Sequence, residues 1–289
     1  MNISIITPIY NGNKYLNKYL KNISQACKNV KNVEVIWVND SPTIEIEYDK
    51  SLVKNFELKI INNEKNLGIH KSRCVGIQEA NGEYVLLLDQ DDEITQNALI
   101  TQYNKITKSN ADMILGNGLC EEENREDKIF ANKFSQNFAS KKRPYILARN
   151  FIISPGQCLI KRRSIPDYWL THTQQDNGAD DYLLWLLMFN NEAKIVCNYD
   201  LVYTHKYTGK NFSLDMDKMF KSQLELIKIL KSNNEYNKKD MQLLERAIMY
   251  KHNYKKHFFK ETLKNLDIFV YNVWYRLVWR GYMPSWKSK

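Results

Sequence analysis

The first half of the chain alternates short apolar runs with longer amphipathic stretches, which is the pattern of strands separated by helices. The apolar runs predict strands at residues 3–6, 33–38, 58–61, 84–88 and 113–115. Between the first two runs, Tyr15, Tyr19 and Ile23 recur at helical spacing. Repeated strand–helix–strand order predicts parallel strands joined by crossover helices, and therefore an open α/β sheet flanked by helices.

The second half of the chain is less regular. Residues 121–142 are charged and polar without a clear period, which predicts a long loop. Further strands are expected at 157–161, 194–197 and 201–205, with a helix over 180–189. After Ser213 apolar residues recur at helical spacing. We therefore predict an α/β domain over 1–212 and a C-terminal helical extension over 213–289.

An acidic cluster follows the apolar run at 84–88. Asp89, Asp91 and Asp92 fall within four positions, and packing does not favour such a cluster because desolvated carboxylates are costly. At the carboxyl end of a buried strand these acids suit a divalent cation, since Mg²⁺ and Mn²⁺ prefer hard oxygen ligands and commonly bind phosphates. The alternative is a capped loop in which Asp92 or Thr95 begins the next helix.

The chain has 289 residues and a formal net charge of +9, most of which lies near the C-terminus. After residue 250 there are nine Lys or Arg against two acids, so the body is nearly neutral and nucleic-acid binding is not expected. Trp, Tyr and Phe alternate with these cations, which suits a peripheral helix on an anionic lipid surface. The alternative is a helical hairpin that packs on the body or a partner, with its lysines in solvent.

Cysteine usage and hydropathy predict the compartment. The five cysteines are scattered and form no Cys-x-x-Cys pair, which is typical of a protein of the reducing cytoplasm. The N-terminus has the pattern of a strand and not of a signal peptide. No apolar stretch reaches the roughly 18 residues of a membrane span. We expect a cytoplasmic protein, with peripheral contact at the inner face of the cell membrane, and the sequence leaves its oligomeric state open.

Several segments, in order along the first two thirds of the chain, resemble the glycosyltransferase family 2 enzymes. They are Ser4-Ile-Ile-Thr-Pro-Ile-Tyr-Asn-Gly12, Val38-Asn-Asp-Ser-Pro-Thr43, Asn66-Leu-Gly68 followed by Arg73 and Gly76-Ile77, and Gly82-Glu-Tyr-Val-Leu-Leu-Leu-Asp-Gln-Asp-Asp92. The resemblance implies a GT-A fold over 1–212, with a mostly parallel, Rossmann-like sheet. It also implies an inverting transfer of sugar from a UDP-sugar to an acceptor hydroxyl.

The same resemblance implies a nucleotide site. The positions assigned to it are Thr7, Pro8, Tyr10, Asp40, Arg73, Asp89 and Gln90. Asp40 matches a carboxylate that accepts from the uracil N–H, and Asp89 would face the ribose and the metal. Asp91 would ligate the Mn²⁺ or Mg²⁺ that bridges the two phosphates. Without the resemblance, Asp40 is typical of a turn residue and Arg73 of a solvated helix face.

A second acidic segment lies at a predicted helix start. Gly178-Ala-Asp-Asp-Tyr-Leu-Leu-Trp185 resembles the family segment that begins a helix near the acceptor. The resemblance aligns Asp181 with the catalytic base and places Asp180 where the family has Glu, so the choice between the two acids stays open. Without the resemblance, two acids at a helix start are typical partners of the helix dipole.

His205 is a further candidate metal ligand. The family often carries a His shortly before an Asn-x-Ser, and Asn211-Phe-Ser213 fits the end of that pattern. Thr208 occupies the expected histidine position, and His205 lies three residues earlier. The alternative is a structural histidine within a strand.

Two other functions remain open from the residues alone. A nucleotidyltransferase also uses strand-end carboxylates and metal, but it favours a glycine-rich phosphate loop, which Asn11-Gly-Asn-Lys14 resembles only weakly. A non-catalytic carbohydrate- or cation-binding module is the other alternative. The sequence does not fix the acceptor, which is a glycan, a lipid-linked sugar or a glycoprotein.

Overall fold

The computed structural model describes residues 2–122, 125–147, 149–206 and 215–279. Its sheet has the order β3-β2-β1-β4-β8-β6-β9-β5, with β7 paired to β6. The strands are β1 (Ile3–Ile9), β2 (Val33–Asn39), β3 (Glu57–Asn62), β4 (Tyr84–Leu87), β5 (Glu93–Ile94), β6 (Met113–Glu122), β7 (Arg125–Lys128), β8 (Cys158–Lys161) and β9 (Ile195–Lys206). The mostly parallel α/β fold expected from the sequence is confirmed.

The first four strands of this order form a parallel unit. β1 pairs with β2 and β4, and β2 pairs with β3, all in parallel. Their residues are almost continuously apolar, because both faces of β1, β2 and β4 are buried. Parallel pairing brings the carboxyl ends of the strands to one edge, and that edge therefore receives Tyr10, Asp40 and Asp89.

The rest of the sheet contains antiparallel pairs, and here the sequence predictions need correction. The strands expected at 194–197 and 201–205 form one strand, β9, which pairs parallel to β6 with register shifts around Asn117. The loop expected over 121–142 is wrong in part, because β6 extends to Glu122, β7 follows as its antiparallel partner, and α4 begins at Lys133. Polar edge strands give little hydrophobic alternation, so periodicity does not reveal them.

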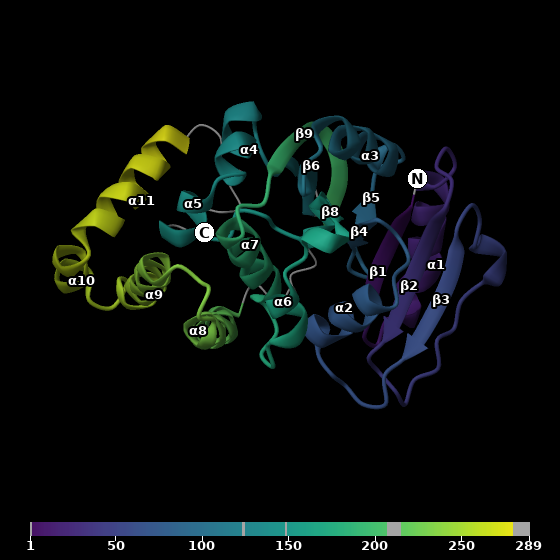
Figure 1. Cartoon of the computed structure of the whole chain (residues 1–289), viewed down its shortest axis with the longest axis horizontal. Helices are drawn as coiled ribbons and strands as arrows, with labels where there is room; N and C mark the ends of the chain where they lie inside the picture. Colours follow the sequence, from purple (N-terminus) through teal and green to yellow (C-terminus); the bar gives the residue numbers. More distant parts are fainter. Residues whose placement is uncertain (1, 123–124, 148, 207–214, 280–289) are drawn as a thin grey trace.

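Helices flank the sheet and continue beyond it (Figure 1). They are α1 (Asn13–Ala26), α2 (Ile69–Gln78), α3 (Ala98–Ser109), α4 (Lys133–Ala139), α5 (Lys142–Leu147), α6 (Asp167–Thr171), α7 (Asp180–Asn190), α8 (Met216–Ser232), α9 (Lys238–Asn253), α10 (Phe258–Lys264) and α11 (Leu266–Trp279). Short 3-10 turns lie at Lys50–Leu52, Pro155–Gln157 and Arg162–Ser164. α7 is buried almost all round, which explains its continuous apolar sequence.

Two glycines fix the position of α2, the helix that carries Arg73. Gly76 lets the helix lie directly on β1, since a Cβ at this position would come within 2.3 Å of Ile6 Cγ2. Gly68 precedes the helix with a φ of 81°, a left-handed conformation that favours glycine. The Asn66 side chain accepts a hydrogen bond from the Gly68 N–H at 3.0 Å. The loop and the helix therefore hold a single geometry at the carboxyl edge.

The C-terminal helices pack on the α/β body. Leu226, Ile227 and Leu230 of α8 and Leu244 and Ile248 of α9 belong to the same buried apolar cluster as the sheet. Figure 1 shows α10 and α11 at one end of the molecule and β1–β3 at the other. Within the described part of the chain, no helix combines the length and the apolar character that crossing a membrane requires.

Candidate active site

The carboxyl edge of the parallel strands gathers most of the acids singled out in the sequence. β2 leads into Asp40, β4 leads into Asp89, and α7 begins there with Asp180 and Asp181. Ligands of open α/β sheets bind beyond the carboxyl ends of the strands. A hollow of about 550 Å³ lies at the opposite edge, lined in part by Asn32. We place the site at the carboxyl edge because the acids and Arg73 converge there.

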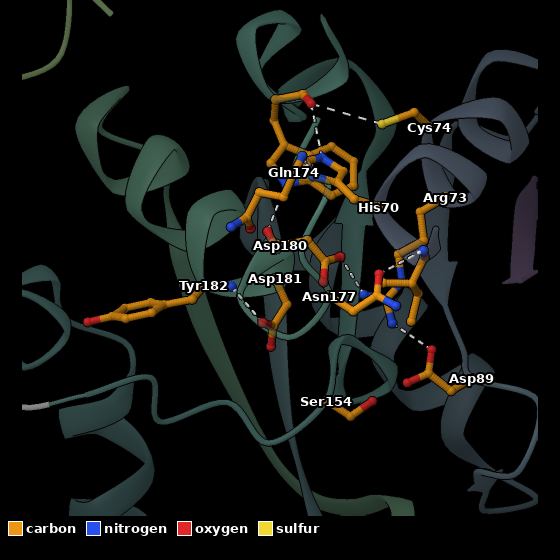
Figure 2. A network of polar contacts seen from close by, with 12 residues as sticks. His70, Arg73, Cys74, Asp89, Ser154, Gln174, Asn177, Asp180, Asp181 and Tyr182 are labelled. Atoms are coloured by element: carbon orange, nitrogen blue, oxygen red, sulfur yellow. Dashed lines mark hydrogen bonds and ion pairs between the residues drawn. The ribbon is translucent and has the colours of Figure 1, made fainter. Parts of the chain in front are cut away.

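Arg73 joins the two acidic segments of this edge (Figure 2). Its Nη2 lies 2.5 Å from Asp89 Oδ1, and its Nη1 lies 2.6 Å from Asp180 Oδ2. The Arg73 side chain is only 3% exposed, so both ion pairs form where water screens them little. Its Nε is buried and has no hydrogen-bond partner among the described residues. The arginine therefore fixes the loop after β4 against the first turn of α7.

Asp180 and Asp181 are neighbours with opposite electrostatic environments. Burial alone would raise the pKa of Asp180, but the charge of Arg73 holds this pKa below its ordinary value. Burial, together with the negative charge of Asp180, raises the pKa of Asp181 to about 7. Asp181 remains partly exposed, and it accepts hydrogen bonds from Asn150 Nδ2 at 2.9 Å and from the Tyr182 N–H at 2.7 Å. An accessible carboxylate with a pKa near 7 is suited to general base catalysis.

Buried residues, among them Trp169 and His70, support the first turn of α7. Trp169 Nε1 donates to the carbonyl of Asp180 at 2.8 Å. His70 stacks against Trp169 with ring centroids 4.2 Å apart. His70 Nδ1 accepts from the Gln174 N–H, so Nε2 carries the proton that is donated to the Trp169 carbonyl. Burial lowers the pKa of His70 to about 4, which keeps this ring neutral.

The buried Asp92 and the partly exposed His205 form a second pair beside the loop after β4. His205 Nδ1 lies 3.4 Å from Asp92 Oδ1, and Asp92 also accepts from the hydroxyls of Tyr203 and Ser154. Burial would lower the pKa of His205, but the hydrogen bond and charge of Asp92 raise it above its ordinary value. Asp92 and the Tyr203 hydroxyl thus hold the Nδ1 side of the His205 ring.

Asp91 differs from its neighbours in being exposed. Partial desolvation of its carboxyl, followed by the charges of Asp92 and Asp89, raises its pKa to about 6. No described residue forms an ion pair with it. Among the described residues, no three His, Cys, Asp or Glu side chains could hold a metal ion by themselves. The chemistry still fits Mg²⁺ or Mn²⁺, which commonly binds one or two carboxylates together with substrate phosphates.

Asp40 is almost fully buried and holds the loop that follows β3. Its Oδ1 accepts from Asn63 Nδ2 at 2.8 Å and from the Leu67 N–H at 2.7 Å, while its Oδ2 accepts from the Gly68 N–H at 2.9 Å. This is a structural role for Asp40 that the sequence did not reveal. A carboxylate has about four acceptor positions, so a further N–H donor from a nucleotide base is compatible with these bonds.

The remaining nucleotide-site candidates divide into exposed and structural residues. Tyr10 is 54% exposed and Pro8 is partly exposed, so both can contact a ligand. Thr7 can shape the site only from within the core, because its side chain is fully buried and its hydroxyl lies 2.5 Å from that of Tyr19. Gln90 makes two hydrogen bonds of 3.0 Å with the backbone of Tyr10, so its amide joins the ends of β1 and β4.

Sequence reasoning missed three residues that the fold brings to the site. Asn150 holds Asp181, while Ser154 and Tyr203 hold Asp92. All three come from segments that were read as irregular or simply as strand, and no local motif marks them. Thr208 and the Asn211-Phe-Ser213 motif lie outside the described residues.

The fold and the edge define an α/β protein that gathers acids and an arginine at the carboxyl ends of its parallel strands, and the comparisons agree with this class of fold. The model of "Glycosyl transferase family 2" matches residues 4–169, and the chain belongs to this family. The resemblance identified from the sequence is therefore confirmed.

Among curated proteins, a stretch of 117 residues is 30% identical to the glycosyltransferase GlyG of Streptococcus pneumoniae serotype 4. It covers 40% of this chain and 38% of GlyG. A stretch of 154 residues is 28% identical to the GalNAc(5)-diNAcBac-PP-undecaprenol beta-1,3-glucosyltransferase of Campylobacter jejuni, and it covers 51% of this chain and 48% of that protein. The chain thus matches less than half of the length of either relative.

Among solved structures, S. aureus TarS 1-349 in complex with UDP-GlcNAc superposes with a TM-score of 0.63. The superposition covers 88% of this chain and 73% of the other, at 19% sequence identity. At this identity the likeness shows the fold alone. The structural likeness extends beyond residue 169, where the family match ends, because the superposition covers 88% of the chain.

Proposed function

We propose that this chain is an inverting glycosyltransferase that moves a sugar from a UDP-sugar to an acceptor hydroxyl, with Asp181 as the general base. The observation that carries the proposal is the environment of Asp181. It is a partly exposed carboxylate at the carboxyl edge, and burial and Asp180 raise its pKa to about 7. Family membership supports sugar transfer, and the partner residues of Asp181 support its role.

The donor would lie across the strand ends, between Tyr10 and the loop after β4. Tyr10 offers an exposed aromatic face for a base, and Asp40 offers an acceptor for its N–H. Asp89 would approach the ribose from its position beside Arg73, while Asp91, with His205 as the second candidate ligand, would hold Mn²⁺ or Mg²⁺ at the diphosphate. The metal, when bound, neutralises the charge that develops on the leaving diphosphate.

The transfer requires one proton to leave the acceptor hydroxyl as its oxygen attacks the anomeric carbon. Asp181 would take this proton, because its raised pKa makes it a stronger base than an ordinary aspartate. Arg73 keeps Asp180 ionised, so Asp180 raises the basicity of Asp181 without competing for the proton. Asn150 and the Tyr182 N–H keep the carboxylate in a single orientation. A single displacement of this kind inverts the anomeric centre.

The acceptor would be a glycan or a lipid-linked or protein-linked sugar, and a cytoplasmic enzyme at the inner face of the membrane would meet any of them. A nucleotidyltransferase is less well supported, because the family model matches more than half of the chain. A purely binding module would not require a carboxylate with a raised pKa at a helix start.

A panel of UDP-sugars tests the proposal without knowledge of the acceptor. The full chain is mixed with each donor and Mn²⁺ in the absence of acceptor, and slow release of UDP from at least one donor is expected. Release should fall on addition of a chelator. If UDP is released from none of them while a GDP-sugar is hydrolysed, the choice of donor is wrong. Absence of hydrolysis and of UDP binding would reject the enzyme.

A further inference from the structure

The helices α10 and α11 expose a row of large apolar side chains. Its members are Phe258 (43% exposed), Phe259 (81%), Leu263 (79%), Leu266 (55%), Val270 (56%), Val273 (37%) and Trp274 (47%). Within α11 the four residues recur at spacings of four, three and one, which places them on one face of the helix. Exposed apolar residues gathered in this way mark an interaction surface. We call this set the α10–α11 face.

The opposite side of α11 is attached to the body, so the α10–α11 face is held outward. Ile268 is fully buried with Leu147, Ala247 and Tyr250. Asn272 Nδ2 donates to the carbonyl of Leu147 at 3.1 Å. Figure 1 shows α11 along the outer end of the molecule, beyond α5 and α9. The helix therefore presents its apolar residues from a fixed position.

Cations outnumber acids on and beside this face. The exposed cations on or beside the two helices are Lys255, Lys256, Lys260, Lys264 and Arg276. Asp267 accepts an ion pair from Arg246 at 2.8 Å, and Glu261 is near the Asn265 amide, at 3.5 Å. The surface is therefore both apolar and positively charged, which is the composition of an interfacial helix.

We propose that the α10–α11 face docks on an anionic lipid surface. Apolar side chains would enter the boundary of the bilayer while the lysines meet lipid phosphates, and each interaction strengthens the other. A second copy of the chain is a poorer occupant, because it would bring the same lysines against these lysines. The inference does not depend on the donor or the acceptor of the enzyme.

Vesicle sedimentation tests this surface with the full chain. The protein should sediment with vesicles of phosphatidylcholine and phosphatidylglycerol in equal parts and stay in solution with phosphatidylcholine alone. Leu263→Glu combined with Val270→Glu should reduce the partition coefficient at least about tenfold, and Lys260→Glu with Lys264→Glu should do the same. Both side-chain pairs are exposed, so neither change disturbs the buried core.

Matched controls separate this surface from general effects. Met216→Glu replaces a comparably exposed apolar residue on α8, and Lys28→Glu with Lys31→Glu makes the same charge change far from the face. Both controls should sediment like the unaltered chain. UDP release from the donor should be the same in every variant, so failure of the membrane proposal is distinguishable from failure of the proposed function. The proposal is overturned if the chain never sediments, or if Leu263→Glu with Val270→Glu only dissociates a dimer in light scattering.

Discussion

The two acidic segments of the carboxyl edge, 89–92 and 180–181, are built in the same way but differ in exposure. Each contains one buried acid with a cationic partner, Asp92 with His205 and Asp180 with Arg73. Each also contains one acid without an ion pair to a described residue, Asp91 and Asp181. Asp91 is exposed with a pKa raised to about 6, whereas Asp181 is partly buried with a pKa raised to about 7.

This difference separates the tasks of the two acids. An exposed carboxylate that lacks a protein cation can accept an incoming metal ion together with its phosphates. A more enclosed carboxylate beside a fixed negative charge holds a proton near neutral pH. Arg73 belongs to both segments, since it binds Asp89 and Asp180 at once. Variants of Asp181, Arg73 and Asp91 can show whether the segments are separate in function and joined by this arginine.

The largest expected effect is on Asp181. Replacing Asp181 by Asn removes the proposed base but keeps the size of the side chain, so kcat for transfer should fall by about 10²–10⁴. The affinity for UDP, measured by titration calorimetry, should not change, because the proposed donor site lies with the other segment. Asp167→Asn, which alters an exposed first-turn acid of α6, should behave like the unaltered enzyme. Undiminished turnover of the Asp181 variant would reject it as the base.

Arg73→Leu should destabilise the fold by about 3–5 kcal/mol, because it leaves Asp180 and Asp89 without their cation. Urea unfolding followed by circular dichroism measures the loss. Arg73→Lys keeps the charge but cannot bridge both acids as a planar fork does, so it should cost less. If Arg73→Leu unfolds at the same urea concentration as the unaltered chain, the arginine does not join the two segments.

Asp91→Ala should weaken UDP binding in the presence of Mn²⁺ by at least about tenfold, with no change in its absence. Titration calorimetry with and without the metal measures both values. Glu83→Gln, at the other end of the same strand, is the matched exposed control. Unchanged heats in the Asp91 variant would show that the metal binds elsewhere.

The smallest effect is a dependence on pH. Because the pKa of Asp181 is raised to about 7, the acid is increasingly protonated below this pH and cannot accept a proton. The transfer rate should therefore rise with pH up to about 7 and level off above it, falling about tenfold per pH unit on the acidic side. Asp180→Asn removes the neighbouring charge and should move this midpoint to lower pH. A midpoint that does not move would show that Asp180 has no influence on the base.

The sequence alone was sufficient to predict the strands that consist of continuous apolar residues. β1, β2 and β4 are continuous apolar runs, and the acids follow them directly, so the carboxyl edge could be predicted from the order of residues alone. The edge strand β7 could not, because its four residues, Arg125–Lys128, are all charged and show no alternation. The helix α4 could not either, because seven residues are too few to show a helical period. Tertiary contacts, and not local pattern, stabilise such elements.

Within the site, the residue types were predictable but their partners were not. Arg73 and Asp180 are 107 positions apart, and nothing in either segment indicates the other. For Thr7 the motif was recognised but the direction of the side chain was not predictable. Its hydroxyl lies in the core against that of Tyr19. Spacing along the chain shows which residues reach an edge of the sheet. It does not show which way each side chain points there.

The loop before α7 depends on α8, which begins far beyond residue 169. Glu225 accepts from the N–H groups of Gln175 and Asp176 at 2.8 and 2.9 Å, and Gln174 Nε2 donates to the Ser222 carbonyl at 2.8 Å. A chimaera that joined the first part of this chain to the helices of a relative would break these contacts close to the base. If segments are exchanged between this chain and a relative to alter specificity, residues 170–232 should therefore be exchanged as a single segment.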